Sequence, residues 1–160
     1  MQDRLRLESF LPFRLIRVAE IVDNGFAHFC GPEDELSWSE WQVLWSLGER
    51  SPTTAKAISG YAGLTKTKIS RAVKVLEDKG YLHRKRDRTD RRFELLSLTP
   101  KGKERFERLA SEAGAFQRWL ERNVNIAYLS SLDSGLVGLE DLISTGHLRA
   151  TQQQAEEPLA

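Results

Sequence analysis

Residues 54–98 read TAKAISGYAGLTKTKISRAVKVLEDKGYLHRKRDRTDRRFELLSL, and the fold follows from this segment. Apolar residues at helical spacing predict a short helix over residues 54–61 and a longer helix over residues 65–79. Between the two lies Ala-Gly-Leu (residues 62–64), a glycine-bearing turn of the kind that joins the helices of a helix-turn-helix. We therefore expect residues 54–79 to form that motif.

The longer of these helices has two unlike faces. Ile69 and the residues three, four and seven positions after it are apolar, so this face is expected in the core. A DNA major groove admits an α-helix, and Arg, Lys, Ser and Thr side chains near the helix N-terminus can pair with base edges. An ordinary solvated basic face is the other interpretation. The residues that we expect to contact DNA are Thr65, which can also cap the helix, and Lys66, Thr67, Lys68, Ser70, Arg71 and Lys74.

A β-hairpin is expected next. Residues 81–86 and 93–98 read as two short strands around the tip DRTDRR, residues 87–92. Arginines at a hairpin tip can enter a minor groove, and aspartates beside them can brace the loop. A solvated charged hairpin is the alternative, but its place directly after a helix-turn-helix favours DNA binding. The tip residues expected at the DNA are Arg88, Asp90, Arg91 and Arg92.

Positive charge is concentrated in the same segment. The whole chain has a formal net charge of +1, yet residues 65–92 hold 11 Lys or Arg against 4 Asp or Glu, a net charge of +7. Residues 1–64 and residues 93–160 carry −3 each. A localised basic element is expected of a surface that binds phosphates. The near-neutral total therefore conceals a strongly basic segment.

Length and composition suit a single domain over residues 1–160, with a polar tail at residues 149–160 that we expect to be disordered. No apolar run reaches the roughly 20 residues that span a bilayer, and no signal-peptide pattern begins the chain. We therefore expect a cytoplasmic protein without a membrane partner. The sequence contains no metal-ligand spacing, phosphate-binding glycine loop or catalytic constellation, so we expect no metal, no cofactor and no enzymatic activity.

Helices are also expected before the motif. Pro12 suits the first turn of a helix over residues 12–29. Ser37 and Glu40 predict a capping box for a helix over residues 38–47. Apolar residues surround nearly the whole circumference of this second helix, which predicts that it is buried at the centre of the protein.

Two further helices are expected after the hairpin. Thr99-Pro100 reads as a cap followed by proline at the first helical position, and the apolar spacing that follows predicts a helix of about 25 residues. A last helix should start near Tyr128 or Ser131. The terminal helices either fold back on their own domain or pair with a second copy in a two-fold dimer, and periodicity leaves both open. The apolar stripe of the last helix consists of Leu132, Leu136, Leu139 and Ile143.

The order of these segments resembles the MarR family of bacterial regulators. The resemblance covers residues 10–146 and rests on LSWSEWQVLWSL before the turn, GLTKTKISRAVKVLEDKGYLHR at the second helix and first strand, DRTDRR at the hairpin tip, and LSLTPKG before the next helix. It implies a mainly α protein with a small β-hairpin wing. A winged helix-turn-helix core (residues 37–98) would be flanked by dimerisation helices (residues 10–30 and 100–148).

The resemblance also implies an obligate homodimer, which favours the second of the two arrangements left open above. Its recognition helices would enter successive major grooves of a pseudopalindromic double-stranded DNA site, and its wings the flanking minor grooves. The family's Asp-x-Arg motif falls on Asp90 and Arg92, so Arg92 inherits the minor-groove role first and Arg91 second. The implied function is sequence-specific regulation of transcription, more often repression.

Many members of the family release DNA when a small, often aromatic or anionic, effector binds between the dimer helices and the DNA-reading part. Aromatic side chains with one cation suit an aromatic acid. The alternative is that the tryptophans only fill the core. The residues expected to line an effector site are Phe13, Arg17, His28, Trp41 and Trp45.

Two other functions are less favoured. Some relatives sense peroxide through a cysteine in the first helix, but Cys30, the single cysteine, falls at the end of that helix with no Lys or Arg close in sequence. A helix C-terminus disfavours a thiolate, which argues against a redox sensor. The second alternative is a winged-helix module that binds a protein partner and lacks the steep salt dependence of phosphate contacts.

Overall fold

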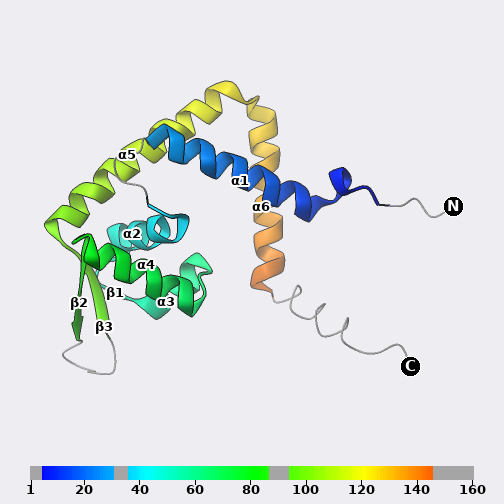
Figure 1. The fold of residues 1–160 in the computed structure, drawn as a ribbon. Coiled ribbons are helices and arrows are strands. Elements are labelled where there is room, and N and C mark those ends of the chain that lie inside the picture. The colour runs from blue at the N-terminus through cyan, green and yellow to red at the C-terminus, as the bar shows by residue number, and fades with distance from the viewer. Residues whose placement is uncertain (1–4, 31–35, 87–93, 146–160) are drawn as a thin grey trace, which may run out of the picture. The chain divides into compact units, whose positions relative to one another are not determined.

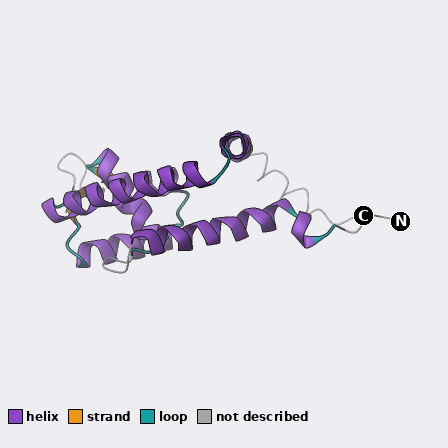
Figure 2. Cartoon of the chain, turned by 90° about the horizontal axis from the view of Figure 1, so that it is seen from above, coloured by secondary structure: helices purple, strands orange, loops and turns teal. Residues whose placement is uncertain are grey.

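The computed structural model describes residues 5–30, 36–86 and 94–145. Helices dominate this part of the chain, and a small antiparallel sheet completes it (Figures 1 and 2). The expected fold class, mainly α with a small β-hairpin, is confirmed. In chain order the elements are η1 (Leu7–Ser9), α1 (Leu11–Cys30), α2 (Trp38–Arg50), β1 (Thr53–Thr54), α3 (Ala55–Ala62), α4 (Lys66–Asp78), β2 (Leu82–Arg86), β3 (Glu94–Leu98), α5 (Pro100–Asn123) and α6 (Ile126–Ser144).

The chain divides into two compact units at a boundary within α5. The first unit ends at Phe116 and the second starts at Gln117. The first unit contains α1 to α4, the sheet and the larger part of α5. The second contains the end of α5 and α6. Within the described ranges, no helix is both long enough and apolar enough to cross a membrane.

The start of α2 is the one expected from the sequence, and its end is not. Ser37 Oγ accepts from the Glu40 N–H at 3.4 Å while the Ser37 N–H donates to Glu40 Oε2 at 3.3 Å, which confirms the capping box. The helix continues to Arg50, three residues beyond the expected end. Trp45 Nε1 donates to Glu49 Oε1 at 2.9 Å, and this contact one turn apart supports the extra residues.

The start of α6 also differs from the expectation. The helix begins at Ile126 rather than near Tyr128 or Ser131. The Ala127 N–H donates to Asn125 Oδ1 at 2.9 Å, so the asparagine provides the local acceptor that starts the helix earlier. Helix α5 runs over 24 residues from Pro100, in agreement with the expected length and start.

The sheet has the strand order β1-β3-β2 and is antiparallel throughout. Strands β2 and β3 form the expected hairpin, in which Leu82 lies opposite Leu98 at one end and Arg86 lies opposite Glu94 at the other. Strand β1 adds two threonines along the other edge of β3 and was not expected. Two residues are too few to give the alternating pattern by which a strand is recognised in sequence.

The core lies among α2, α3, α4, the sheet and α5. Leu44 and Leu47 of α2 are fully buried, but Trp38 is 50% exposed, so the expectation that this helix is buried around its circumference is wrong. The three tryptophans of α2 are stacked along one side of the helix, where such large side chains are rarely fully buried. Helix α4 contributes the expected core residues Ile69, Ala72, Val73 and Leu76.

A compact set of contacts connects the end of α4 to the start of α5, and we call Gly80, Tyr81, Thr99 and Gly102 the joint. Gly80 has a φ of 75°, the left-handed conformation expected where α4 must stop. Thr99 Oγ1 donates to the Gly80 carbonyl at 2.6 Å and accepts from the Gly102 N–H at 3.0 Å, which confirms the threonine as the cap of α5. The Thr99 N–H donates to the Tyr81 carbonyl at 3.0 Å. The first turn of α5 is thereby fixed to the backbone that follows α4.

Candidate nucleic-acid interface

The turn before α4 sets the direction in which this helix leaves α3. Gly63 has a φ of 63°, a conformation that glycine adopts without the steric cost of a side chain. Ser59 Oγ donates to the Leu64 carbonyl at 2.6 Å and holds the turn against α3. The Lys68 N–H donates to Thr65 Oγ1 at 3.3 Å, so the threonine is the N-cap that the sequence predicts.

The face of α4 opposite the core is exposed along its length. Because Ile69, Ala72, Val73 and Leu76 are each no more than 4% exposed, packing fixes which face of the helix points outward. Figure 1 shows α4 in green, beside α3 and the sheet. All of the residues expected to contact DNA from this helix and its cap are exposed: Thr65, Lys66, Thr67, Lys68, Ser70, Arg71 and Lys74.

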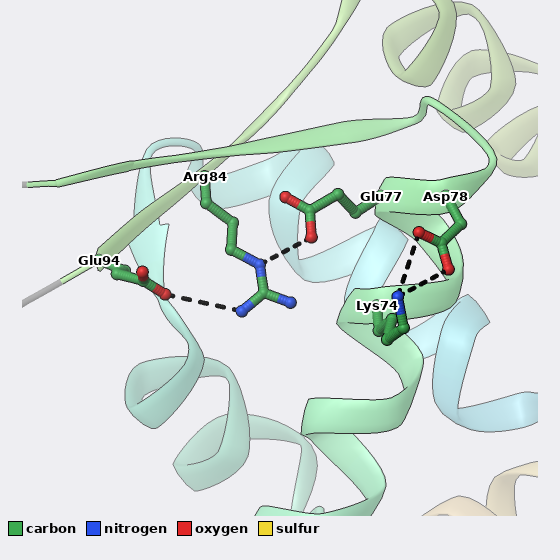
Figure 3. Close-up of polar contacts among 5 residues, drawn as sticks. All are labelled: Lys74, Glu77, Asp78, Arg84 and Glu94. Atoms are coloured by element: carbon green, nitrogen blue, oxygen red, sulfur yellow. Dashed lines mark hydrogen bonds and ion pairs between the residues drawn. The ribbon is translucent and has the colours of Figure 1, made fainter.

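The cations on this face are not equivalent. Lys74 Nζ lies 3.2 Å from Asp78 Oδ2, one turn further along α4 (Figure 3). The two side chains are 72% and 63% exposed, so solvent screens this pair and it contributes little to stability. Among the described residues, Lys66, Lys68 and Arg71 have no ion-pair partner. Their charges are therefore the more available for phosphates or bases.

Strand β2 adds basic side chains that sequence reasoning had not singled out. The run HRKR over residues 83–86 is exposed and continues the positive charge of α4 into the hairpin. These residues were included in the count of positive charge. The alternation expected along a strand did not indicate which of their side chains are exposed. Arg84 differs from its neighbours, because its Nε lies 2.9 Å from Glu77 Oε2 and its Nη1 lies 3.6 Å from Glu94 Oε2 (Figure 3).

The expected contacts at the hairpin tip lie outside the described residues. The structure reaches Arg86 on one strand and resumes at Glu94 on the other. The roles assigned to Arg88, Asp90, Arg91 and Arg92 therefore stay predictions.

Known proteins share this arrangement in sequence. The family model described as MarR family matches residues 35–92, which contain α2, the helix-turn-helix and the first part of the hairpin. A curated relative, the uncharacterized HTH-type transcriptional regulator YwoH of Bacillus subtilis, is 32% identical over 71 residues. The match covers 44% of this chain and 51% of YwoH, so the chain spans about half the length of this relative.

Solved structures extend the likeness to nearly the whole described fold. A probable transcriptional regulator from Pseudomonas aeruginosa is 26% identical with a TM-score of 0.75, over 84% of this chain and 99% of that one. The chain is similar to the MarR family in the matched segment and in its fold. CouR of Rhodococcus jostii RHA1, a transcriptional repressor solved bound to a 23-mer DNA duplex, has the same fold at 24% identity and a TM-score of 0.75, over 86% of this chain and 99% of CouR.

The likeness to the MarR family indicates which observed elements correspond to the parts of a winged helix-turn-helix. Family and fold are those of transcriptional regulators and not of enzymes. In the MarR fold of this chain, α3 and α4 are the helix-turn-helix, and β2 and β3 are the strands of the wing. We call α4 the recognition helix from here on.

A cluster of aromatic rings contains two of the residues expected at an effector site, Trp41 and Trp45. Trp41 is stacked between Trp38 and Trp45, with ring centroids 4.8 Å apart in both pairs. Phe26 of α1 approaches Trp41 edge-on at 6.1 Å and also contacts Phe116 of α5 at 5.3 Å. The buried Nε1 of Trp41 has no hydrogen-bond partner among the described residues. Most buried polar atoms in proteins have a hydrogen-bond partner, so this indole N–H is an uncommon feature of the cluster.

The other expected effector residues lie on α1 and are not joined to this cluster. The Arg17 guanidinium carbon lies 5.7 Å from the centre of the Phe13 ring, and His28 is exposed. Within the described chain, neither a ring contact nor a hydrogen bond connects these side chains to the tryptophans. Cys30 is the last residue of α1, as expected, and its side chain lies outside the described part. No group of three His, Cys, Asp or Glu side chains in the described ranges is arranged to hold a metal.

Proposed function

We propose that this protein is a sequence-specific regulator that binds double-stranded DNA as a homodimer, represses transcription at a pseudopalindromic operator and releases it when a small effector binds. The observation that carries the proposal is the division of the recognition helix. One face is buried in the core, while the other presents hydroxyl groups and three cations that have no ion-pair partner among the described residues. Such a face suits a major groove, where Arg and Lys pair with guanine and hydroxyl groups with several bases.

The wing completes the proposed contact with DNA. Strand β2 carries exposed basic residues toward the tip, where Arg92, Arg91 and Arg88 would enter the minor groove beside the recognition site. Asp90 would orient one of these arginines rather than contact the DNA itself.

DNA binding is tested in two steps. The wild-type protein first selects a duplex from a randomised library, and its affinity for that duplex is then measured over a series of salt concentrations. Log affinity is expected to fall with log salt at a slope of about −0.9 for each phosphate that the protein neutralises. Arg71→Ala should weaken binding of the selected duplex by about tenfold, since a side chain that pairs with a base contributes about 1–3 kcal/mol. Lys103→Ala on α5 removes an exposed cation outside the reading helix and should change the affinity much less.

Two results would speak against DNA binding. One is the absence of any selected duplex at low salt, and the other is an affinity that neither salt nor Arg71→Ala changes. Either would favour the alternative of a winged-helix module that binds a protein partner.

The homodimer is proposed from apolar side chains on the terminal helices. On α1, Ile16 and Ile21 are 61% and 63% exposed, and on α6, Leu132 and Leu136 are 49% and 41% exposed. Isolated helices are only marginally stable in water, and most helices in proteins depend on packing of an apolar face. A second copy of the chain would supply that packing, and a two-fold dimer would place two recognition helices at a fixed separation.

The effector is proposed to be a small aromatic acid that contacts the tryptophan cluster. A ligand that accepts a hydrogen bond from Trp41 Nε1 would remove the cost of a buried donor without a partner. Effector binding should quench tryptophan fluorescence and lower the affinity for DNA. By linkage, DNA should lower the affinity for the effector by the same factor. We expect titration with 4-hydroxybenzoate to produce both effects, and Trp41→Phe to reduce them.

Trp119→Phe provides the control for this titration, because Trp119 lies on α5 and is 49% exposed. That variant should respond to 4-hydroxybenzoate as the wild-type protein does. If Trp41→Phe and the wild type are quenched alike, or if quenching leaves DNA binding unchanged, the cluster is only part of the core. The roles assigned to Phe13, Arg17 and His28 in this site stay proposals.

A further inference from the structure

We propose that Arg84 is a positioning residue that holds the wing strands against the recognition helix, and that it does not contact DNA. The inference rests on the proposed DNA binding and identifies which residue sets the geometry of that surface. In sequence, Arg84 is one of several cations in a basic run. In the structure, the Arg84 side chain forms ion pairs with two carboxylates, one on α4 and one on β3.

One guanidinium connects three elements. Arg84 projects from β2, and its Nε lies 2.9 Å from Glu77 Oε2 near the end of the recognition helix. Its Nη1 lies 3.6 Å from Glu94 Oε2 at the start of β3 (Figure 3). The planar guanidinium offers donors in fixed directions, so it can bind two carboxylates at once, as a lysine cannot with the same geometry.

The surroundings of Arg84 make this contact more than an incidental surface pair. The side chains of Arg84 and Glu77 are 35% and 38% exposed, against 72% and 63% for Lys74 and Asp78. Partial burial reduces the screening of the Arg84–Glu77 pair by solvent. Because Glu94 also orders the Arg84 side chain, forming the pair with Glu77 costs less conformational entropy. The side chain is therefore committed to the two carboxylates and is a poor candidate for a phosphate contact.

The matched pair Lys74–Asp78 joins two residues of one helix, so it cannot fix the wing. Glu77 and Asp78 are adjacent in sequence, each carries one negative charge on the recognition helix, and each has one cationic partner (Figure 3). They differ in where the cationic partner lies. The partner of Glu77 is Arg84 on β2, whereas the partner of Asp78 is Lys74 on the same helix. This difference allows a test in which electrostatics alone and positioning predict opposite signs.

Glu77→Gln and Asp78→Asn each remove one negative charge near the proposed DNA surface. If long-range attraction to phosphates were the only effect, both variants would bind the selected duplex more tightly. The positioning role predicts that Glu77→Gln binds about threefold more weakly, the factor expected for loss of a partly buried ion pair. Asp78→Asn should bind about twofold more tightly, since Lys74 is released for the DNA.

A second measurement does not depend on DNA. Hydrogen exchange of the backbone amides of β2 and β3 in the free protein should be faster in Glu77→Gln and Arg84→Gln than in the wild type, and unchanged in Asp78→Asn. Arg84→Lys should restore part of the protection and part of the affinity. If the wild-type protein binds no duplex, the proposed function fails while hydrogen exchange still tests whether Arg84 holds the wing.

Two outcomes would overturn the inference. In the first, Glu77→Gln and Asp78→Asn tighten DNA binding alike and exchange is unchanged, so the contact positions nothing. In the second, exchange becomes faster but affinity does not fall, so Arg84 is a brace without a role in DNA binding. Thermal unfolding of each variant would show that the comparison is made on folded protein.

Discussion

Gly102→Ala is expected to destabilise the protein by about 3 kcal/mol, the upper part of the range for forcing extra volume into a packed site. A Cβ at this position would overlap the carbonyl oxygen of Tyr81, which is backbone and accepts the Thr99 N–H. The carbonyl cannot move away without breaking the joint. Alanine is the better helix former by about 1 kcal/mol, so the steric cost must exceed this gain to produce the expected loss.

Urea unfolding of wild type and variant at one protein concentration measures the effect, because the stability of a dimer depends on concentration. Gly60→Ala is the matched control. Gly60 lies within α3, and a Cβ there would meet no atom within 4 Å. This variant should be neutral or more stable by up to about 1 kcal/mol. Equal stabilities of Gly102→Ala and Gly60→Ala would mean that the joint is looser than described.

Leu136→Glu is expected to dissociate the proposed dimer into single chains. The variant should therefore also lose tight binding to a DNA site that has two halves. Leu136 lies on the apolar stripe of α6 and is 41% exposed on the single chain, so the substitution need not disturb the core of one chain. In a two-fold interface each substitution appears twice and buries two charges without partners. Loss of the second reading head should weaken binding of the selected duplex by at least about 100-fold, because linked sites commonly gain 10²–10⁴ in affinity.

Sedimentation equilibrium and duplex titration together check this expectation. The wild-type protein should have twice the mass of the 18.3 kDa chain, and Leu136→Glu the mass of one chain. Ser134→Glu adds the same charge to the opposite side of α6 and should stay dimeric with nearly normal affinity. A Leu136→Glu protein that is still dimeric would place the interface elsewhere.

The recognition helix could be predicted from sequence nearly to the residue. Thr65 caps it, Gly80 follows its end, and the apolar face that includes Ile69 and Leu76 is buried as expected. Each of these features depends on neighbours within one or two turns of the helix. Capping, helical periodicity and the φ preference of glycine are local properties, so the sequence states them directly.

The parts that could not be predicted depend on residues far apart in the chain. Arg105 has the sequence context of a solvent-exposed residue of α5, yet it is only 5% exposed in the folded chain. Strand β1 exists only because β3 is beside it. The need for glycine at position 102 arises from the Tyr81 backbone, which is 21 residues earlier. No local pattern records these approaches.

The candidate DNA surface divides in the same way. The sequence by itself determined the outward face of α4 and the concentration of positive charge, and it indicated the family that the protein resembles, because helical spacing and charge are written in residue order. Only the tertiary structure decided which cations of that surface are available. Arg71 has no ion-pair partner among the described residues, Lys74 pairs along its own helix, and Arg84 bridges the recognition helix and the wing strands. An ion pair between elements forms only when folding brings its two charges within a few ångströms, and residue order alone does not specify that distance.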